Sequence, residues 1–256
     1  MDEKEAGAAR LHVAGDLTIG AEVALDEGQA HYLRNVLRLT PGARVALFNG
    51  RDGEAAAELQ TLGKKSGSAR VLSQTRPQTP EPDLWLLFAP LKRARVDFIA
   101  EKATELGVSR LAPVITRRTQ GGRVPTDRLA AIAVEAAEQC ERLSIPEVAE
   151  PVSLVDLPAD WPAERRLIIC DETGGGGPIA SVLADLAPGP LAVLIGPEGG
   201  FAPGELETLT DIPLVTRVSL GPRILRADTA AVAVLSVVQS LLGDWRSLLP
   251  RSSQPS

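Results

Sequence analysis

The stretch LAVLIGPEGGFAPG, Leu191–Gly204, decides the fold class of this chain. It begins with an uninterrupted apolar run that ends at Ile195, as is typical of a strand buried on both faces of a sheet. A glycine-rich turn follows in Gly196–Gly200, and we then expect a short helix near Pro203–Leu209. Glycines after a buried strand let a ligand approach the backbone, and open α/β sheets bind ligands at this end of their strands. The stretch therefore predicts an α/β domain with a ligand site, although the loop alone is also compatible with a simple turn.

Two further segments share this design of a strand followed by glycine. Leu220–Thr229, LGPRILRADT, carries Arg223 and Arg226 ahead of a helix for which we expect Asp228 as the N-cap. In Cys170–Pro178, CDETGGGGP, the glycines indicate either a close approach of the backbone or plain flexibility, and we favour flexibility. None of these loops contains G-x-G-x-x-G or the Lys-Ser/Thr of a phosphate loop, so the common nucleotide-binding motifs are not indicated.

Strands and helices alternate through the C-terminal two thirds of the chain, which predicts a mostly parallel α/β sheet. The expected strands are Leu84–Ala89, Leu111–Ile115, Leu167–Cys170, Leu191–Ile195 and Leu214–Leu220. The expected helices are Ala94–Leu106, Asp127–Cys140, Pro178–Leu186 and Asp228–Leu242. Helical spacing of the apolar residues places Cys140 in the core rather than in a reactive site.

The first 75 residues have a different pattern of expected elements, with short strand-like segments separated by turns. The pieces are Leu11–Val13, Glu22–Leu25, Arg44–Phe48, Ala55–Thr61 and Arg70–Leu72. A short amphipathic helix is expected over His31–Leu39. We expect a small β-barrel domain over 1–75, a proline-rich linker over 76–82, an α/β domain over 83–246 and a disordered tail over 247–256.

The composition, with 44% hydrophobic and 23% charged residues, is that of a globular protein rather than a disordered one. The longest uncharged stretch, Thr229–Gly243, is shorter than the ~20 residues that a membrane span needs. The N-terminus has no apolar signal core, so we expect a cytoplasmic protein. The two cysteines and two histidines lack metal-ligand spacing, and neither a metal site nor a disulfide framework is expected.

The net charge of −6 argues on average against a nucleic-acid partner. Basic residues are nevertheless concentrated in residues 92–123, where eight of them stand against three acidic ones. A basic segment within an acidic chain indicates either an anion-binding surface or a solvated helix face.

Several motifs together resemble the RsmE-type 16S ribosomal RNA uridine-N3 methyltransferases, a family of the SPOUT class. The motifs are LIGPEGG at Leu194–Gly200, LGPRILR at Leu220–Arg226, HYLRNVLR at His31–Arg38, EKATELGV at Glu101–Val108 and Glu-Gln-Cys at Glu138–Cys140. The resemblance runs from about residue 10 to residue 243. The chain has Glu141-Arg142 where the family often has Gly-Arg, and Ala227-Asp228-Thr229 where it often has Thr-Glu-Thr. The second change shortens the acidic side chain, which leaves a capping role for it and weakens a reaching role.

The resemblance implies a knotted SPOUT-type α/β methyltransferase domain with a parallel sheet, and a small N-terminal PUA-like β-barrel domain that helps to hold RNA. It implies a homodimer that binds S-adenosylmethionine in the knot and methylates N3 of a specific uridine in the 16S rRNA of the small ribosomal subunit. The cofactor-binding residues that it implies are Leu194, Ile195, Gly196, Pro197, Glu198, Gly199, Gly200, Leu220, Gly221, Ile224 and Leu225.

The implied reaction sets what the site has to do. Uridine N3 is a weak nucleophile until its imide proton leaves, so the site has to position two reactants and favour the uracil anion. Arg226 is the candidate to stabilise that anion, and Glu198 and Asp228 are candidates to accept the proton; alternatively, Glu198 only shapes its turn. The candidate RNA contacts are Arg34, Arg38, Lys92, Arg93, Arg117 and Arg118. Aromatic residues make up only 3% of the chain, so recognition should depend on phosphate and shape more than on stacking.

Two other interpretations stay open. An RNA-binding or ribosome-assembly module without catalysis would suit the basic segments but would leave the glycine loops unused. A nucleotide-binding enzyme of the ordinary doubly wound type would lack its phosphate-binding fingerprint. Saturable binding of S-adenosylmethionine separates the methyltransferase from the first alternative, and indifference to nicotinamide and adenine nucleotides sets aside the second.

Overall fold

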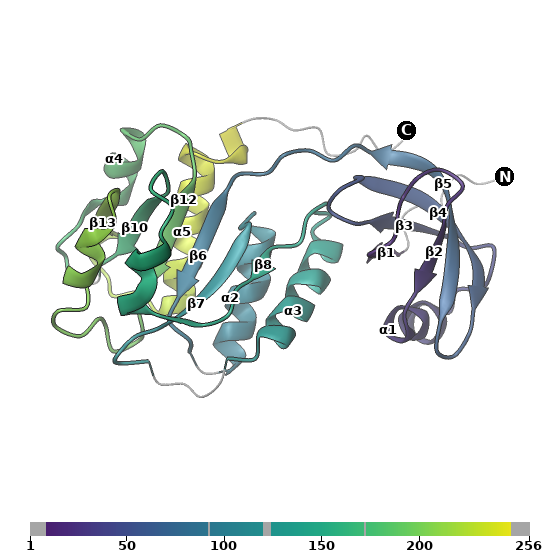
Figure 1. Ribbon diagram of the computed structural model, residues 1–256, viewed down its shortest axis with the longest axis horizontal. Helices are drawn as coiled ribbons and strands as arrows, with labels where there is room; N and C mark the ends of the chain where they lie inside the picture. Colours follow the sequence, from purple (N-terminus) through teal and green to yellow (C-terminus); the bar gives the residue numbers. More distant parts are fainter. Residues whose placement is uncertain (1–8, 92, 120–123, 172, 247–256) are drawn as a thin grey trace. The chain divides into compact units, whose positions relative to one another are not determined.

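The computed structural model describes residues 9–246 apart from 92, 120–123 and 172 (Figure 1). Its contacts divide the chain into two compact units. The N-terminal unit comprises the chain up to Pro80 together with Ala137–Ile145, and the C-terminal unit comprises Glu81–Ala136 and the chain from Pro146. The tail expected over 247–256 lies outside the described residues. Among the helices that are described, none is long and apolar enough to cross a membrane.

The N-terminal unit is built on a five-stranded sheet in the order β1-β3-β4-β5-β2. The strands are β1 (Arg10–His12), β2 (Glu22–Leu25), β3 (Arg44–Phe48), β4 (Glu54–Leu62) and β5 (Gly67–Arg76). β1 pairs with β3 in parallel, and the other pairs are antiparallel. Register shifts between β4 and β5 bend this pair. The expected mainly β unit is confirmed, although β5 is longer than the expected strand Arg70–Leu72 and takes in the first residue of the expected linker.

The helical segment of this unit begins earlier than the expected His31–Leu39. Helix α1 (Glu27–His31) continues directly into a π-helical turn, Tyr32–Val36. Asp26 caps α1, because its carboxylate accepts from the Gln29 amide and the Gln29 side chain accepts from the Asp26 amide. This reciprocal Asp-x-x-Gln pair is a capping box, a sequence pattern that marks the N-terminus of a helix.

The segment Ala137–Ile145 is tied into the N-terminal unit by Arg10. Arg10 Nη1 donates to the Ala137 carbonyl at 2.7 Å, and the guanidinium lies 3.8 Å from the centre of the Phe48 ring. Its Nε is 2.6 Å from a carboxylate oxygen of Glu54. Both charged side chains are almost buried, with 12% and 11% of their surface exposed, so these partners are needed to offset the loss of water.

The C-terminal unit holds a parallel sheet in the order β11-β13-β10-β12-β6-β7-β8, with β9 beside β7 (Figure 1). The strands are β6 (Leu84–Phe88), β7 (Arg110–Ile115), β8 (Glu147–Val148), β9 (Val152–Ser153), β10 (Arg166–Cys170), β11 (Gly177–Pro178), β12 (Leu191–Ile195) and β13 (Val215–Ser219). The helices are α2 (Arg93–Glu105), α3 (Thr126–Gln139), α4 (Ile179–Ala184) and α5 (Ala227–Leu241). The expected parallel α/β class is confirmed.

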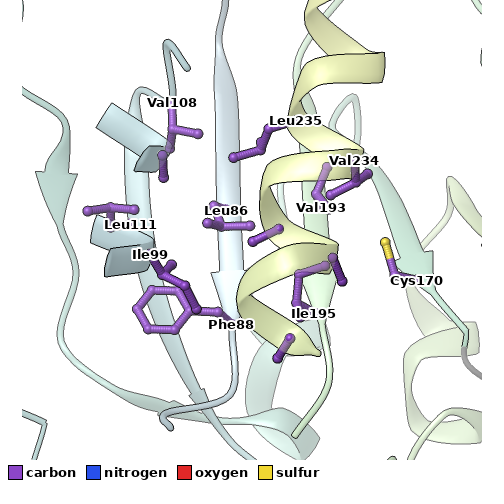
Figure 2. Close-up of a cluster of buried hydrophobic side chains, with 14 of the residues drawn as sticks. Leu86, Phe88, Ile99, Val108, Leu111, Cys170, Val193, Ile195, Val234 and Leu235 are labelled. Atoms are coloured by element: carbon purple, nitrogen blue, oxygen red, sulfur yellow. The ribbon is translucent and has the colours of Figure 1, made fainter. Parts of the chain in front are cut away.

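The central strands bury side chains on both faces, which is why they read as continuous apolar runs. One face packs against α2 and α5, and Figure 2 shows this cluster with Leu86, Phe88, Ile99, Val193, Ile195 and Leu235. On the other face, Leu87 and Leu194 belong to a second cluster with Leu209 of a 3₁₀ helix, Glu207–Asp211. Apolar packing therefore covers both faces of the sheet, and loops form the edge at which the strands have their carboxyl ends.

The start of α5 differs from the expectation. Its N-cap is Arg226, whose backbone is extended and whose side chain makes no capping hydrogen bond, rather than Asp228. Asp228 lies in the first turn of the helix instead, where a negative charge interacts favourably with the helix dipole.

Two other local expectations are wrong. The helix expected near Pro203–Leu209 is only the 3₁₀ helix Glu207–Asp211, because Gly204 has a φ of +84° that no helix accommodates. Cys140 is half-buried rather than in the core, since α3 ends one residue before it and the apolar stripe stops there.

Glu141 provides a test of this local structure. It has a φ of +62°, in the region that favours glycine, at the position where the family named above often has glycine. Because the left-handed strain outweighs the added freedom of glycine in the unfolded chain, Glu141→Gly should raise the free energy of unfolding by about 0.5–1 kcal/mol. Urea denaturation measures this change.

The matched control is Glu22→Gly, which changes an exposed glutamate in the extended strand β2. There glycine should lower the free energy of unfolding by about 0.5–1 kcal/mol. A Glu141→Gly protein as destabilised as Glu22→Gly would contradict the assigned backbone conformation.

Candidate functional site

The loops that follow β10, β12 and β13 line one cavity of about 730 Å³ in the C-terminal unit. These three strands lie side by side and run in parallel, so their carboxyl ends share one edge of the sheet. Helix α2 and the first residues of α5 complete the lining. The volume lies within the range of about 300–1,000 Å³ that is usual for small-molecule sites.

Most of the residues expected at a cofactor site are brought together here. The lining includes Ile195, Gly196, Pro197, Glu198, Gly200, Leu220, Gly221, Ile224 and Leu225. Leu194 is fully buried in the core on the other face of the sheet and does not line the cavity. The backbone of Gly199 faces Arg118, whose Cδ is 3.7 Å from the place where a Cβ on this glycine would stand.

Close approach explains Gly175 and Gly176, so the flexibility favoured above is wrong for these two, whereas Gly174 has open space around it and a φ of +81°. A Cβ on Gly176 would stand 2.5 Å from the backbone nitrogen of Val218, and β11 pairs with β13 directly after it. A Cβ on Gly175 would stand 2.8 Å from a carboxylate oxygen of Asp171. The loop therefore lies against the neighbouring strand at Gly176, where a side chain larger than hydrogen would meet the Val218 backbone.

This loop also supplies lining residues that the sequence analysis missed, namely Cys170, Asp171, Thr173 and Gly174. The signal was present, since a third glycine-rich segment after a parallel strand has to reach the same edge. Asp171 shapes the loop: its Oδ1 accepts from the amide and hydroxyl of Thr173 at 2.9 and 2.6 Å, and Arg217 Nη1 lies 3.8 Å from Oδ2. Burial raises the pKa of the Cys170 thiol to about 12, so this cysteine stays protonated and is no nucleophile at neutral pH.

Arg95, on the first turns of α2, also lines the cavity and was not among the expected site residues. Its guanidinium donates to the Glu198 carboxylate, and its Nε lies 4.0 Å from an Asp228 carboxylate oxygen. Arg95 therefore links the loop after β12 to the start of α5, and it contacts both candidate proton acceptors. Only the surplus of basic residues in 92–123 pointed towards it in the sequence.

Arg226 also lines the cavity, at the N-cap of α5. The side chain is exposed, and the described part of the chain offers its guanidinium no hydrogen-bond or ion-pair partner. A cation without a partner at the cavity wall is suited to an anion that arrives with a substrate. Within the same described ranges, no three His, Cys, Asp or Glu side chains are grouped as a metal site requires.

The candidate RNA contacts fall in both units. Arg34 and Arg38 are exposed in the N-terminal unit, in and after the π-helical turn. Arg117 and Arg118 are exposed in the C-terminal unit, directly after β7. Lys92 and the side chain of Arg93 lie outside what the structure describes.

Comparison with known proteins adds relatives that cover nearly the whole chain. An RNA methyltransferase domain model matches residues 78–239, and an RNA methyltransferase PUA domain model matches residues 25–72. The ribosomal RNA small subunit methyltransferase E of Rickettsia conorii is 31% identical over 233 residues, which cover 91% of this chain and 95% of the relative. The protein of the same name from Synechocystis is 33% identical and covers 91% of this chain and 78% of the relative.

Solved structures give the same result. The ribosomal RNA small subunit methyltransferase E of Neisseria gonorrhoeae, bound to S-adenosylmethionine, is 28% identical with a TM-score of 0.82, over 93% of this chain and 99% of that one. A methyltransferase of Legionella pneumophila in complex with the same cofactor is 29% identical with a TM-score of 0.81, over the same shares of the two chains.

Gly176 tests whether the loop after β10 depends on close approach. Gly176→Ala places a methyl group against the Val218 backbone and should lower the free energy of unfolding by about 1–3 kcal/mol. Gly189→Ala is the matched control, since nothing stands within 4 Å of its added Cβ, and it should change stability by less than about 0.5 kcal/mol. Equal stability of the two variants, measured by urea denaturation, would show that the loop tolerates bulk.

Proposed function

This chain belongs to the ribosomal RNA small subunit methyltransferase E family, and from that premise we propose that it transfers a methyl group from S-adenosylmethionine to N3 of a uridine in 16S rRNA. It is an RNA methyltransferase with the parallel-sheet α/β fold of the SPOUT class and an N-terminal PUA domain. The observation that carries the proposal is the single cavity lined by all three glycine-rich loops. A module that only binds RNA would have no use for this cavity.

The residues of the cavity fit the cofactor. Gly196, Gly200 and Gly221 line the cavity without side chains that would keep a ligand from their backbone, while Ile195 and Leu225 offer apolar surface for an adenine ring. When it is bound, the cofactor supplies a methyl group already activated by its sulfonium. We propose that the loops after β12 and β13 hold the adenosyl part and form the knot that the family likeness implies.

The charged side chains in and next to the cavity then have separate roles. We assign Arg226, which is exposed and without a partner among the described residues, to the uracil anion that forms when the N3 proton leaves. Glu198 is hydrogen-bonded to Arg95, so we assign it to holding the loop after β12. Asp228 does not line the cavity, although its neighbour Ala227 does. Its carboxylate lies 4.0 Å from Arg95 Nε, and we assign it to accepting the imide proton.

The partners follow from the substrate. We propose that Arg34 and Arg38 of the PUA domain and Arg117 and Arg118 of the methyltransferase domain contact RNA phosphates. We also propose a homodimer, which would double the basic surface of a chain whose net charge is −6. The place of action is the cytoplasm, where small ribosomal subunits are found.

The proposed reaction is tested with radiolabelled S-adenosylmethionine and small ribosomal subunits that lack the modification, followed by nucleoside analysis. Label in 3-methyluridine is the expected result. Label in another nucleoside would mean that the protein is a methyltransferase with a different target nucleotide. No transfer and no cofactor binding would leave an RNA-binding module as the better interpretation.

Arg226 and Arg95, two of the three arginines that line the cavity, should differ in their effects on the reaction and on cofactor binding. Arg226→Ala should lower the single-turnover rate by about 100-fold, as expected when a charge-stabilising donor is lost. Arg95→Ala should instead weaken cofactor binding by about 10-fold, or ~1.4 kcal/mol, because the loop after β12 loses its tie to α5. Isothermal titration calorimetry and single-turnover transfer separate these effects.

Arg128→Ala is the matched control. Arg128 lies on α3 and pairs with Asp97 of α2, the helix that carries Arg95, but it is not part of the cavity lining. It should keep the affinity and the rate of the unaltered protein. If Arg226→Ala lost affinity and rate in equal measure, Arg226 would be a binding residue rather than a catalytic one.

A further inference from the structure

The turn that carries Arg117 and Arg118 is joined to the loop that follows β12. The turn closes on itself at the end of β7, where the Thr116 amide donates to the Thr119 hydroxyl at 2.8 Å. β7 and β12 are not neighbours, since β6 lies between them in the sheet. Side chains therefore have to make the link between the turn and the loop. Arg117 Nη1 donates to the Pro203 carbonyl at 3.3 Å, and Glu205 and Arg118 make two shorter links.

Glu205 makes the first link. Its side chain is buried, with 1% of the residue exposed, and its Oε1 accepts from the Arg117 amide at 2.6 Å. Its Oε2 accepts from the Ala202 amide, also at 2.6 Å. A buried carboxylate is costly unless such donors satisfy it. The turn and the far end of the loop are therefore held together as one body.

Arg118 makes the second link, and it acts nearer to the cavity. Its Nη1 donates to the Gly199 carbonyl at 2.8 Å. Gly199 lies between Glu198 and Gly200, which both line the cavity. Arg118 is exposed, and a guanidinium has five N–H donors, so the bond to Gly199 leaves donors for an anion from solvent.

We propose that Arg118 couples RNA binding to cofactor binding. A phosphate held by the guanidinium fixes the side chain of Arg118, and the fixed side chain holds the Gly199 carbonyl and the cavity-lining residues on either side of it. The cofactor then meets a loop whose freedom is already reduced, and it binds more tightly. By linkage, the cofactor strengthens RNA binding by the same factor. This inference rests on the proposed function, because it requires both ligands.

The geometry also says why arginine is needed. A planar guanidinium can donate to a phosphate in bidentate fashion and to a carbonyl at the same time, whereas a lysine ammonium is a compact point charge on a flexible stem. Arg118→Lys therefore separates the charge, which should still attract RNA, from the bridge to Gly199.

The coupling is measured by equilibrium dialysis of radiolabelled S-adenosylhomocysteine, which has no methyl group to transfer. Each protein is dialysed alone and with saturating small ribosomal subunits that lack the modification, and subunits without protein give the blank. The unaltered protein should bind the labelled ligand about 5-fold more tightly, or better, in the presence of subunits. Arg118→Ala should show no such change, and Arg118→Lys should lose most of it while still cosedimenting with subunits.

Arg34→Ala is the matched control, since it removes a proposed phosphate contact from the PUA domain, in the other unit. It should need more subunits for saturation but keep the 5-fold effect once saturated. The inference is overturned if the unaltered protein binds both ligands without mutual effect, or if Arg118→Ala keeps the full effect. Failure of the proposed function looks different, because the unaltered protein would then bind no labelled ligand or no subunits.

Discussion

The pairing of β10 with both β12 and β13 is the constraint on which the rest of the molecule depends. In this register Cys170 stands opposite Ile195 on one side and Val218 on the other, so three parallel strands end at one level. Loops from three distant parts of the sequence therefore meet at one edge, and they enclose the cavity. The apolar cores on both faces fix the strands, and the strands fix where the chemistry can take place.

Apolar side chains such as Phe201 and Leu225 anchor the loops to the two cores, and hydrogen bonds to charged groups add to this packing. Arg95 ties the loop after β12 to α5, Glu205 ties it to the turn after β7, and Asp171 closes the loop after β10 on itself. Hydrogen bonds to charged groups contribute about 1.5–3 kcal/mol each, which is enough to order a loop but less than the packing that orders the sheet. A rigid sheet thus carries a rim that can adjust when ligands bind.

The sequence predicts the parts of the molecule that local patterns determine. The apolar runs before Ile195 and Cys170 placed β12 and β10, and the glycines after them placed the loops. It did not predict the role of Arg95, because nothing near Arg95 in the chain says that β6 and β12 are neighbours. The tight packing of Gly176 on Val218 was missed for the same reason, since a glycine run looks alike whether it is free or confined. The N-cap of α5 was misplaced by two residues because Asp228 suits both positions chemically.

The N-terminal unit includes the distant segment Ala137–Ile145, and this limits which parts of the gene recombination can exchange. The segment lies far along the gene from the first 80 residues, yet Ala137 and Leu143 pack on Phe48, and Ala137 receives a bond from Arg10. A polypeptide that stopped at Pro80 would leave the Phe48 ring without its contacts to Ala137 and Leu143, and Arg10 without two of its acceptors, the Ala137 and Arg142 carbonyls. The N-terminal unit is thus no self-contained module that recombination can exchange at a single joint, and the two gene segments that encode it have to be inherited together.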